Sequence, residues 1–147
     1  EVEQSDPGFE NPQDIFRAHW YAGAAFVLRA MTSEQRELVD PGLRTVAEKG
    51  EAITLDDYQK AAMARSALTV TMRKFHQSHD LLLTPTLPVT AFDVGNDYPP
   101  GRGSADNNIG WITYTYPFNL SGHPAITVPA GFAAAWPDLR AIIEKLR

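Results

Sequence analysis

Cysteine is absent from the 147 residues, which excludes disulfides, thiolate nucleophiles and zinc sites built on sulfur. Long apolar runs are also missing: the longest, Ala22 to Leu28 and Leu81 to Leu83, fall well short of the roughly 20 residues that a membrane span needs. Basic charge is in deficit, with 13 Lys and Arg, scattered along the chain, against 18 Asp and Glu. These features predict a partner that is neither a nucleic acid nor a membrane.

The first residues, Glu1 to Pro12, are acidic and polar, whereas a signal peptide is basic and then apolar. We therefore expect a cytoplasmic protein. Hydrophobic residues at 44% and charged residues at 21% are ordinary globular values. A chain of this length can bury roughly 70% of the surface that its unfolded form exposes, so a hydrophobic core is expected.

Capping signals predict several helices in residues 1–79, which we expect to be mainly helical. Asn11 as N-cap, with Pro12 at the first helical position, predicts a long amphipathic helix to about Ala30. Thr32 followed by Gln35 is the pattern of a capping box and predicts a short second helix.

Two further helix starts follow the same logic. Asp40 before Pro41 predicts a third helix, which Gly50 would end. Thr54 followed by Asp57 predicts a capping box and a fourth helix that runs to about His79.

After His79 the periodicity changes, and residues 80–132 are expected to form a strand, a loop and a second strand. Leu81 to Leu83 form a continuous apolar run before Pro85, typical of a short strand buried on both faces. Ala125 to Val128 alternate between two prolines as a strand would. A short helix is expected from Ile109 to Tyr116, and a terminal helix within residues 133–147, starting at Pro137. The expected fold class is α/β, with helices packed on strands.

Four short patterns suggest chemistry, and each has a structural explanation that we favour. His76 and His79 could share a metal ion with Asp80, but histidines at a helix end also suit the helix dipole. Gly101 to Ser104 has the glycines of a phosphate loop but lacks its Lys-Ser/Thr ending.

The other two patterns are a hydroxyl–imidazole pair and a pair of acids. Ser121 and His123 lack an orienting acid and a nucleophile-elbow motif, so we interpret them as turn residues. Asp56 and Asp57 lie where a helix N-terminus favours negative charge. The residues taken alone identify no catalytic set.

Two longer strings resemble a known family. DLLLTPTLPVTA (Asp80 to Ala91), then Trp111 and YTYPFNLSGHPAITVPAGF (Tyr114 to Phe132), resemble the C-terminal part of amidase signature enzymes. The helical stretch from Asp40 to Phe75 is similar to the one that the family carries just before. The resemblance implies a hydrolase of carboxamide C–N bonds, built on a large mixed β-sheet wrapped by helices and needing no cofactor or metal.

The family uses a Ser–cis-Ser–Lys triad in a Gly/Ser-rich stretch that has no counterpart in these 147 residues, so the resemblance assigns no catalytic residue. It implies a partial amidase-signature domain spanning residues 1–147, inactive alone, whose partners are the remainder of the amidase chain and a small-molecule amide. A homodimer is left open. After Phe132 the family's usual strand pair is missing, so either Phe132 and Ala133 are not true neighbours or a deletion occurred.

The resemblance also gives the stretch before Gly122 a role. The family's short helix carrying this motif lines the substrate pocket, which implies that Trp111, Thr115 and Phe118 contact the amide substrate. The same residues could equally be core residues, because pockets and cores are both lined by apolar and aromatic groups. The competing hypothesis for the whole chain is a non-catalytic remnant or a partner-bound structural module.

Overall fold

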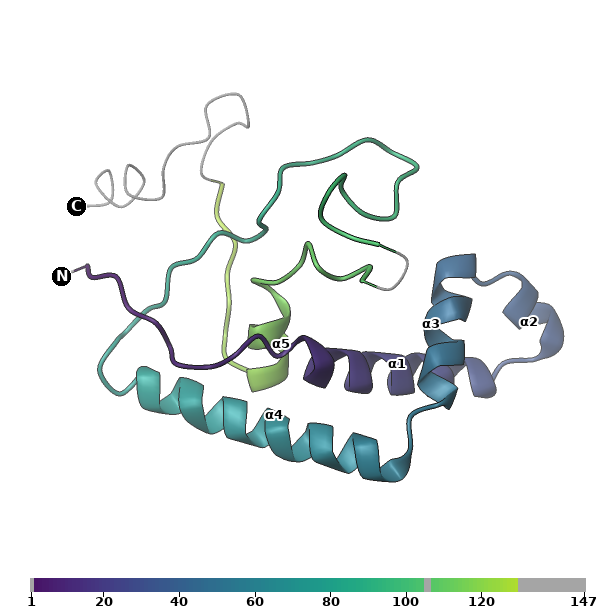
Figure 1. Cartoon of the computed structure of the whole chain (residues 1–147), viewed down its shortest axis with the longest axis horizontal. Coiled ribbons are helices and arrows are strands. Elements are labelled where there is room, and N and C mark those ends of the chain that lie inside the picture. Colours follow the sequence, from purple (N-terminus) through teal and green to yellow (C-terminus); the bar gives the residue numbers. More distant parts are fainter. Residues whose placement is uncertain (1, 105–106, 130–147) are drawn as a thin grey trace.

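The computed structural model describes residues 2–104 and 107–129, and its regular structure is helical. In chain order the helices are α1 (Gln13–Arg29), α2 (Ser33–Glu37), α3 (Pro41–Glu51), α4 (Leu55–Phe75) and α5 (Tyr116–Ser121). Figure 1 shows α1 and α4 along the body of the molecule, α2 and α3 at one end, and α5 on α4, beside the start of α1. The segments before α1 and between α4 and α5 are extended chain and turns.

Local side-chain caps explain where three of the helices begin, as the sequence predicted. Thr32 and Gln35 form a reciprocal capping box at α2, and Thr54 and Asp57 form another at α4. At α3 the Asp40 carboxylate accepts a hydrogen bond from a main-chain N–H, and proline follows it at the first helical position. Each cap satisfies backbone donors that have no partner within the helix.

Helices α1 and α3 cross at Gly50, which the sequence wrongly predicted to end α3. The helix continues to Glu51, and Gly50 is buried. A Cβ atom at this position would lie 1.9 Å from the carbonyl oxygen of Tyr21 and 3.0 Å from the Cβ of Ala25. Gly50 is therefore required by the close approach of the two helix backbones, and not by helix termination.

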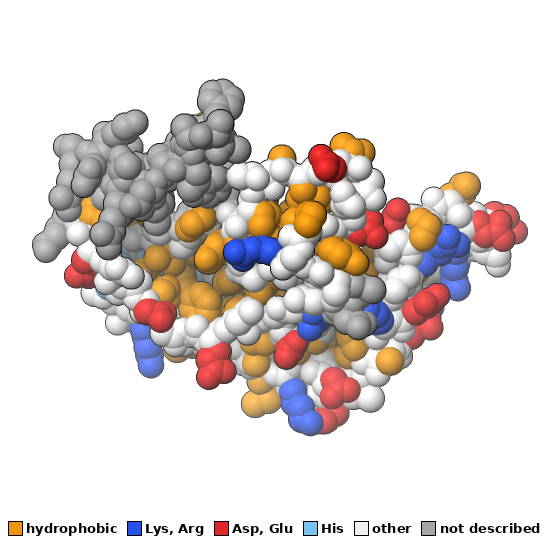
Figure 2. All heavy atoms as spheres, turned by 45° about the horizontal axis from the view of Figure 1, so that its top comes forward, with side chains coloured by type: hydrophobic (Ala, Val, Ile, Leu, Met, Phe, Trp, Pro, Cys, Tyr) orange, Lys and Arg blue, Asp and Glu red, His pale blue; other side chains and the backbone are white. Residues whose placement is uncertain are grey.

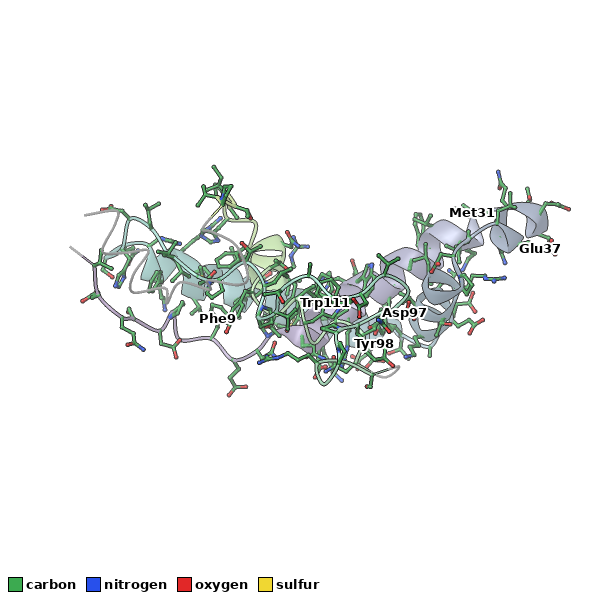
Figure 3. The ribbon with its side chains drawn as sticks, turned by 90° about the horizontal axis from the view of Figure 1, so that it is seen from above. Phe9, Met31, Glu37, Asp97, Tyr98 and Trp111 are labelled. Carbon is green, nitrogen blue, oxygen red and sulfur yellow. The ribbon has the colours of Figure 1, made fainter. Side chains whose placement is uncertain are left out.

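The main hydrophobic cluster joins α4 to α5. Its buried members are Leu68, Met72 and Leu120, and Met72 is completely inaccessible. Partly buried residues from the N-terminal segment, α1, the chain after α4, and α5 pack around it: Phe9, Ile15, Phe16, Leu82 and Phe118. These contacts fix α5 on α4. In Figure 3, Phe9 of this cluster and Trp111, which precedes α5, both lie away from the α2 end of the molecule, where Met31 and Glu37 lie.

The expected α/β fold with helices packed on a mixed β-sheet is wrong for the residues that the structure describes, because they contain no strand. Leu81 and Leu83 are 86% and 47% exposed, and Ile126 and Val128 are 88% and 62% exposed. Both segments run without a backbone ladder to another described residue. A strand exists only when a neighbour takes up its N–H and C=O groups, and no described segment lies in position to do so.

Two further helices differ from prediction. α4 ends at Phe75 and continues only as turns to Ser78. The segment from Ile109 to Thr115 forms turns, and α5 begins at Tyr116, where the expected helix would have ended. The terminal helix and the suspected discontinuity at 132/133 lie outside the described residues. No helix in the described ranges is long and apolar enough to cross a membrane.

Candidate functional site: the wall around α5

Trp111 lies in the turns that lead into α5. Its indole N–H donates to the carbonyl of Asn108 at 3.0 Å, and its ring meets Phe92 edge-on with 5.4 Å between centroids. The side chain is partly buried. These contacts fold the loop that precedes α5 back onto itself.

Thr115 and Phe118 lie at the start and in the middle of α5. The Thr115 hydroxyl donates to the carbonyl of Ile112 at 2.9 Å instead of capping the helix. Phe118 is partly buried against the cluster around Leu68 and Met72. The three predicted substrate contacts therefore occupy one short segment, but each side chain is directed to a different neighbour.

The N-terminal end of α5 is tied to the chain that enters α1. Tyr116 is fully buried, its hydroxyl donates to Asn11 Oδ1 at 2.6 Å, and its ring stacks on Phe16 with centroids 5.1 Å apart. Burial raises the pKa of Tyr116, although the Asn11 hydrogen bond opposes the shift. Asn11 was expected to cap α1, but Pro12 occupies that position and the Asn11 amide serves α5 instead.

The C-terminal end of α5 is held by two side chains from one face of α4. Arg65 Nε donates to the carbonyl of Leu120 at 2.7 Å. One helical turn later, Thr69 Oγ1 lies 3.5 Å from the carbonyl of Ser121. Gly122 closes the helix in the left-handed conformation, with φ of 71°, and its N–H donates to Phe118 O. Carbonyls that lack partners inside a six-residue helix are thus satisfied from α4.

Ser121 and His123 do not form a nucleophile–base pair. The Ser121 hydroxyl is buried and donates to the carbonyl of Phe118 in its own helix, at 3.4 Å. The left-handed Gly122 turns the chain between Ser121 and His123. The interpretation of both residues as turn residues is only partly right, because Ser121 is the last residue of α5 and the turn begins at Gly122.

The histidines near the end of α4 contact one another and the N-terminal segment. His76 Nδ1 lies 2.9 Å from His79 O, and its ring is 5.4 Å from that of His123. The His79 ring stacks on Phe75 at 4.1 Å, and its Nε2 lies 2.7 Å from Glu3 Oε1. Within the described ranges, no three His, Asp or Glu side chains are grouped to hold a metal ion.

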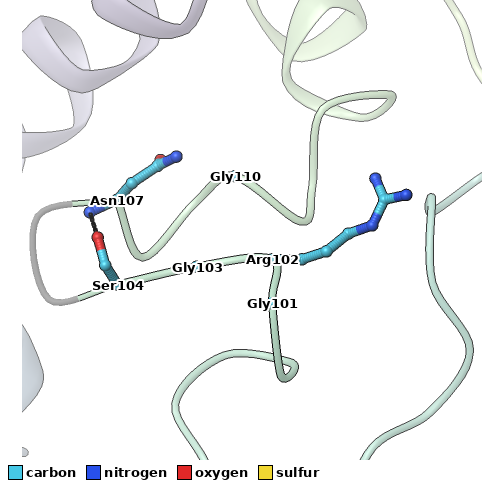
Figure 4. A pocket seen from close by; sticks show the side chains of 6 residues that line it. All are labelled: Gly101, Arg102, Gly103, Ser104, Asn107 and Gly110. Carbon is cyan, nitrogen blue, oxygen red and sulfur yellow. Dashed lines mark hydrogen bonds between the residues drawn. The ribbon is translucent and has the colours of Figure 1, made fainter.

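Surface hollows lined by described residues lie elsewhere on the chain. One, of about 460 Å³, is lined by the loop from Gly101 to Ser104 with Asn107 and Gly110. Figure 4 shows the Arg102 side chain directed away from Ser104 and Asn107, so the loop does not converge on a ligand. Another, of about 280 Å³, lies between the N-terminal segment and α4. Neither is lined by a predicted substrate contact.

Comparison with known proteins places the chain in a family. Residues 13–137 match the model of the family described as Amidase, which is most of the chain and includes α1 to α5. The chain belongs to the amidase family. The resemblance inferred from the residues around Leu81 and α5 is thereby confirmed.

The curated relatives of this amidase-family chain are much longer than the chain itself. An acylamidase from Rhodococcus erythropolis is 30% identical over 139 residues, which cover 91% of this chain and 29% of the relative. An amidase from Pseudomonas putida is 30% identical over 108 residues, covering 71% of this chain and 23% of the relative. A glutamyl-tRNA(Gln) amidotransferase subunit from Streptococcus gordonii is 37% identical over 82 residues, covering 54% and 16%. The chain therefore spans less than a third of these relatives. No solved structure matches.

Sequence reasoning missed the residues that hold α5 in this amidase-family chain. Arg65 was not singled out, and Asn11 was assigned to a cap, because their partners lie 55 and 105 positions away. The aromatic Tyr116 inside a proline-containing motif was the available signal for a buried anchor. No local pattern pointed to Arg65.

Proposed function

We propose that this chain supplies the C-terminal portion of an amidase-type hydrolase of carboxamide C–N bonds, and that it is inactive without the remainder of the enzyme. The observation that carries the proposal is the family match over residues 13–137, in a chain that spans 29% of the acylamidase relative. The Gly/Ser-rich stretch that holds the family's serine nucleophile has no counterpart in these residues. The catalytic serines and lysine are therefore contributed by the remainder.

Exposed apolar side chains support a partner for this chain. Leu81 and Ile126 are each more than four-fifths exposed, in extended segments on either side of α5 in the sequence. Figure 2 shows hydrophobic side chains gathered in the middle of one face of the molecule. Exposed contiguous apolar surface of this kind marks a protein–protein contact. The remainder of the amidase is the partner that we assign to it.

Within that enzyme, we assign Trp111, Thr115 and Phe118 to the wall of the substrate pocket. All three are partly buried, so each presents some surface beyond its contacts within the chain. A wall with two aromatic rings and one hydroxyl suits an amide with an apolar acyl or amine group. Cytoplasmic location, oligomeric state and the single-domain assignment to residues 1–147 stay predictions.

Complementation tests the proposal. The chain is produced alone and together with the preceding region of the Rhodococcus erythropolis acylamidase, and both preparations are assayed for hydroxamate formation from simple amides and hydroxylamine. We expect turnover only from the pair. Turnover by the chain alone would show that it contains its own catalytic set, and a bound but inactive pair would favour the structural-module hypothesis.

The site assignment has its own test in the active pair. Replacement of Thr115 or Phe118 by alanine is expected to raise KM for the amide several-fold, with Tyr114→Ala as control because Tyr114 is 41% exposed in the same segment. Thermal unfolding of each variant separates loss of substrate contact from loss of folding. If the Thr115 and Phe118 variants had the same KM as the Tyr114 control, Thr115 and Phe118 would be core residues and not substrate contacts.

A further inference from the structure

Helix α5 is too short to hold its own position. It has six residues, and isolated helices shorter than about 12 residues are marginal in water. Its N-cap residue, Thr115, makes no capping hydrogen bond with its side chain. The orientation of α5, and with it the positions of Thr115 and Phe118, must therefore come from contacts outside the helix.

One of these contacts is a charged donor from the middle of α4. Arg65 Nε lies 2.7 Å from Leu120 O, a short distance typical of a charge-assisted hydrogen bond. The acceptor is one of the carbonyls at the C-terminal end of α5, where the partial negative charge of the helix dipole lies. Arg65 thus donates to α5 at the end where carbonyls lack partners within the helix and where the helix dipole favours a positive charge.

A second α4 side chain supports the first. Thr69 Oγ1 lies 3.1 Å from Arg65 O and 3.5 Å from Ser121 O, so its single proton is shared between a carbonyl of α4 and one at the last turn of α5. Leu68, between them in sequence, packs with Leu120 in the core cluster. Polar and apolar contacts from a single turn of α4 therefore meet the same end of α5.

We infer that Arg65 is a positioning residue for the substrate wall, acting through Leu120 O to fix the orientation of α5. This inference rests on the proposed function, because it assigns a purpose to a wall whose role in substrate binding is itself proposed. Arg65 does not contact the substrate. Its loss should weaken substrate binding while leaving the chemical step, performed by residues elsewhere, nearly unchanged.

Two substitutions of equal reach separate the hydrogen bond from the charge. In Arg65→Gln the amide nitrogen occupies the same place along the side chain as Nε and can still donate to Leu120 O. In Arg65→Met a methyl group occupies that place and cannot donate. The control is Arg73→Met, the same change at an exposed arginine later on α4, for which the described residues show no hydrogen bond or ion pair.

The first measurement uses the 147-residue chain alone and reads amide hydrogen exchange at Asn119 and Gly122, whose N–H groups are bonded within α5. Loss of one charge-assisted hydrogen bond is expected to lower protection there by about tenfold in Arg65→Met. Arg65→Gln, which keeps the hydrogen bond but not the charge, should lose less protection than Arg65→Met, and Arg73→Met should exchange like the unmodified chain. Equal protection in all four proteins would overturn the role of Arg65 in holding α5.

The second measurement uses the complemented enzyme and reads KM and kcat separately. Arg65→Met is expected to raise KM about tenfold with kcat within about twofold, and Arg65→Gln to raise KM by a smaller factor than Arg65→Met. An unmodified pair without turnover refutes the proposed function and leaves the exchange result to decide whether Arg65 holds α5. An active pair in which Arg65→Met leaves KM unchanged refutes the positioning role alone.

Discussion

Gly50 offers a test of how closely α1 and α3 must pack. In Gly50→Ala the added Cβ would lie 1.9 Å from Tyr21 O, whereas real Cβ contacts essentially never fall below 3.0 Å. The blocking atom belongs to the backbone of α1, so a side-chain rotation cannot relieve the clash. The two helices must separate by about 1 Å, and buried side chains at the crossing, such as Ala25, lose contact.

The magnitude follows from two opposing effects. Overpacking of this kind costs about 3 kcal/mol of folding free energy. Alanine regains about 1 kcal/mol over glycine through its higher helix propensity. The net destabilisation is about 2 kcal/mol, which corresponds to a fall in Tm of about 4–8 °C for a chain of this size.

Gly23→Ala is the matched control, because Gly23 lies inside α1 and nothing lies within 4 Å of a Cβ built there. It should raise the free energy of unfolding by about 1 kcal/mol. Both variants are compared by urea titration and by thermal unfolding followed by circular dichroism. If Gly50→Ala proved as stable as Gly23→Ala, the close crossing of α1 and α3 would be refuted.

Three further predictions concern polar contacts. Tyr116→Phe removes the hydrogen bond to Asn11 and should cost about 1 kcal/mol by urea titration. Because the pKa of Tyr116 is raised by folding, the unmodified chain should lose stability as the pH rises through about 10, and Tyr116→Phe should lose less. Asp40→Ala should lower the free energy of unfolding by about 1 kcal/mol, whereas Asp40→Asn, which keeps a capping oxygen, should change it little. Hydrogen bonds from the Thr54 hydroxyl and N–H lower the pKa of Asp57, so acidification below about pH 4 should weaken the cap. When the free energy of unfolding is measured against pH, Asp57→Asn should therefore lose less stability in acid than the unmodified chain.

Residues whose partners are close in sequence were predicted correctly. The capping boxes at Thr32 and Thr54 join positions three apart, and the Asp40 cap reaches Leu43, so each needed only local chemistry. These caps set the starts of α2, α3 and α4, and thus much of the helical part of the fold.

Residues whose partners are distant were predicted wrongly or not at all. The run from Leu81 to Leu83 has the composition of a buried strand, but burial depends on a neighbour that the described residues do not supply. Glycine often ends a helix, yet the role of Gly50 is set by its close approach to Tyr21 on another helix. The pocket-wall residues were located by family resemblance, and the arginine that holds their helix was found only from the structure.

The contacts that hold α5 join residues far apart in the sequence, and this affects the order of folding. α3 and α4 both contact α1 through residues that have all been synthesised once Phe75 is made. By contrast, α5 needs closures of 55 and 105 positions, to Arg65 and Asn11, and these carry a larger chain-entropy cost. During synthesis the three helices can pack while α5 is still inside the ribosome. The segment assigned to the substrate is then the last part of the described helical body to form, docking onto a platform that is already assembled.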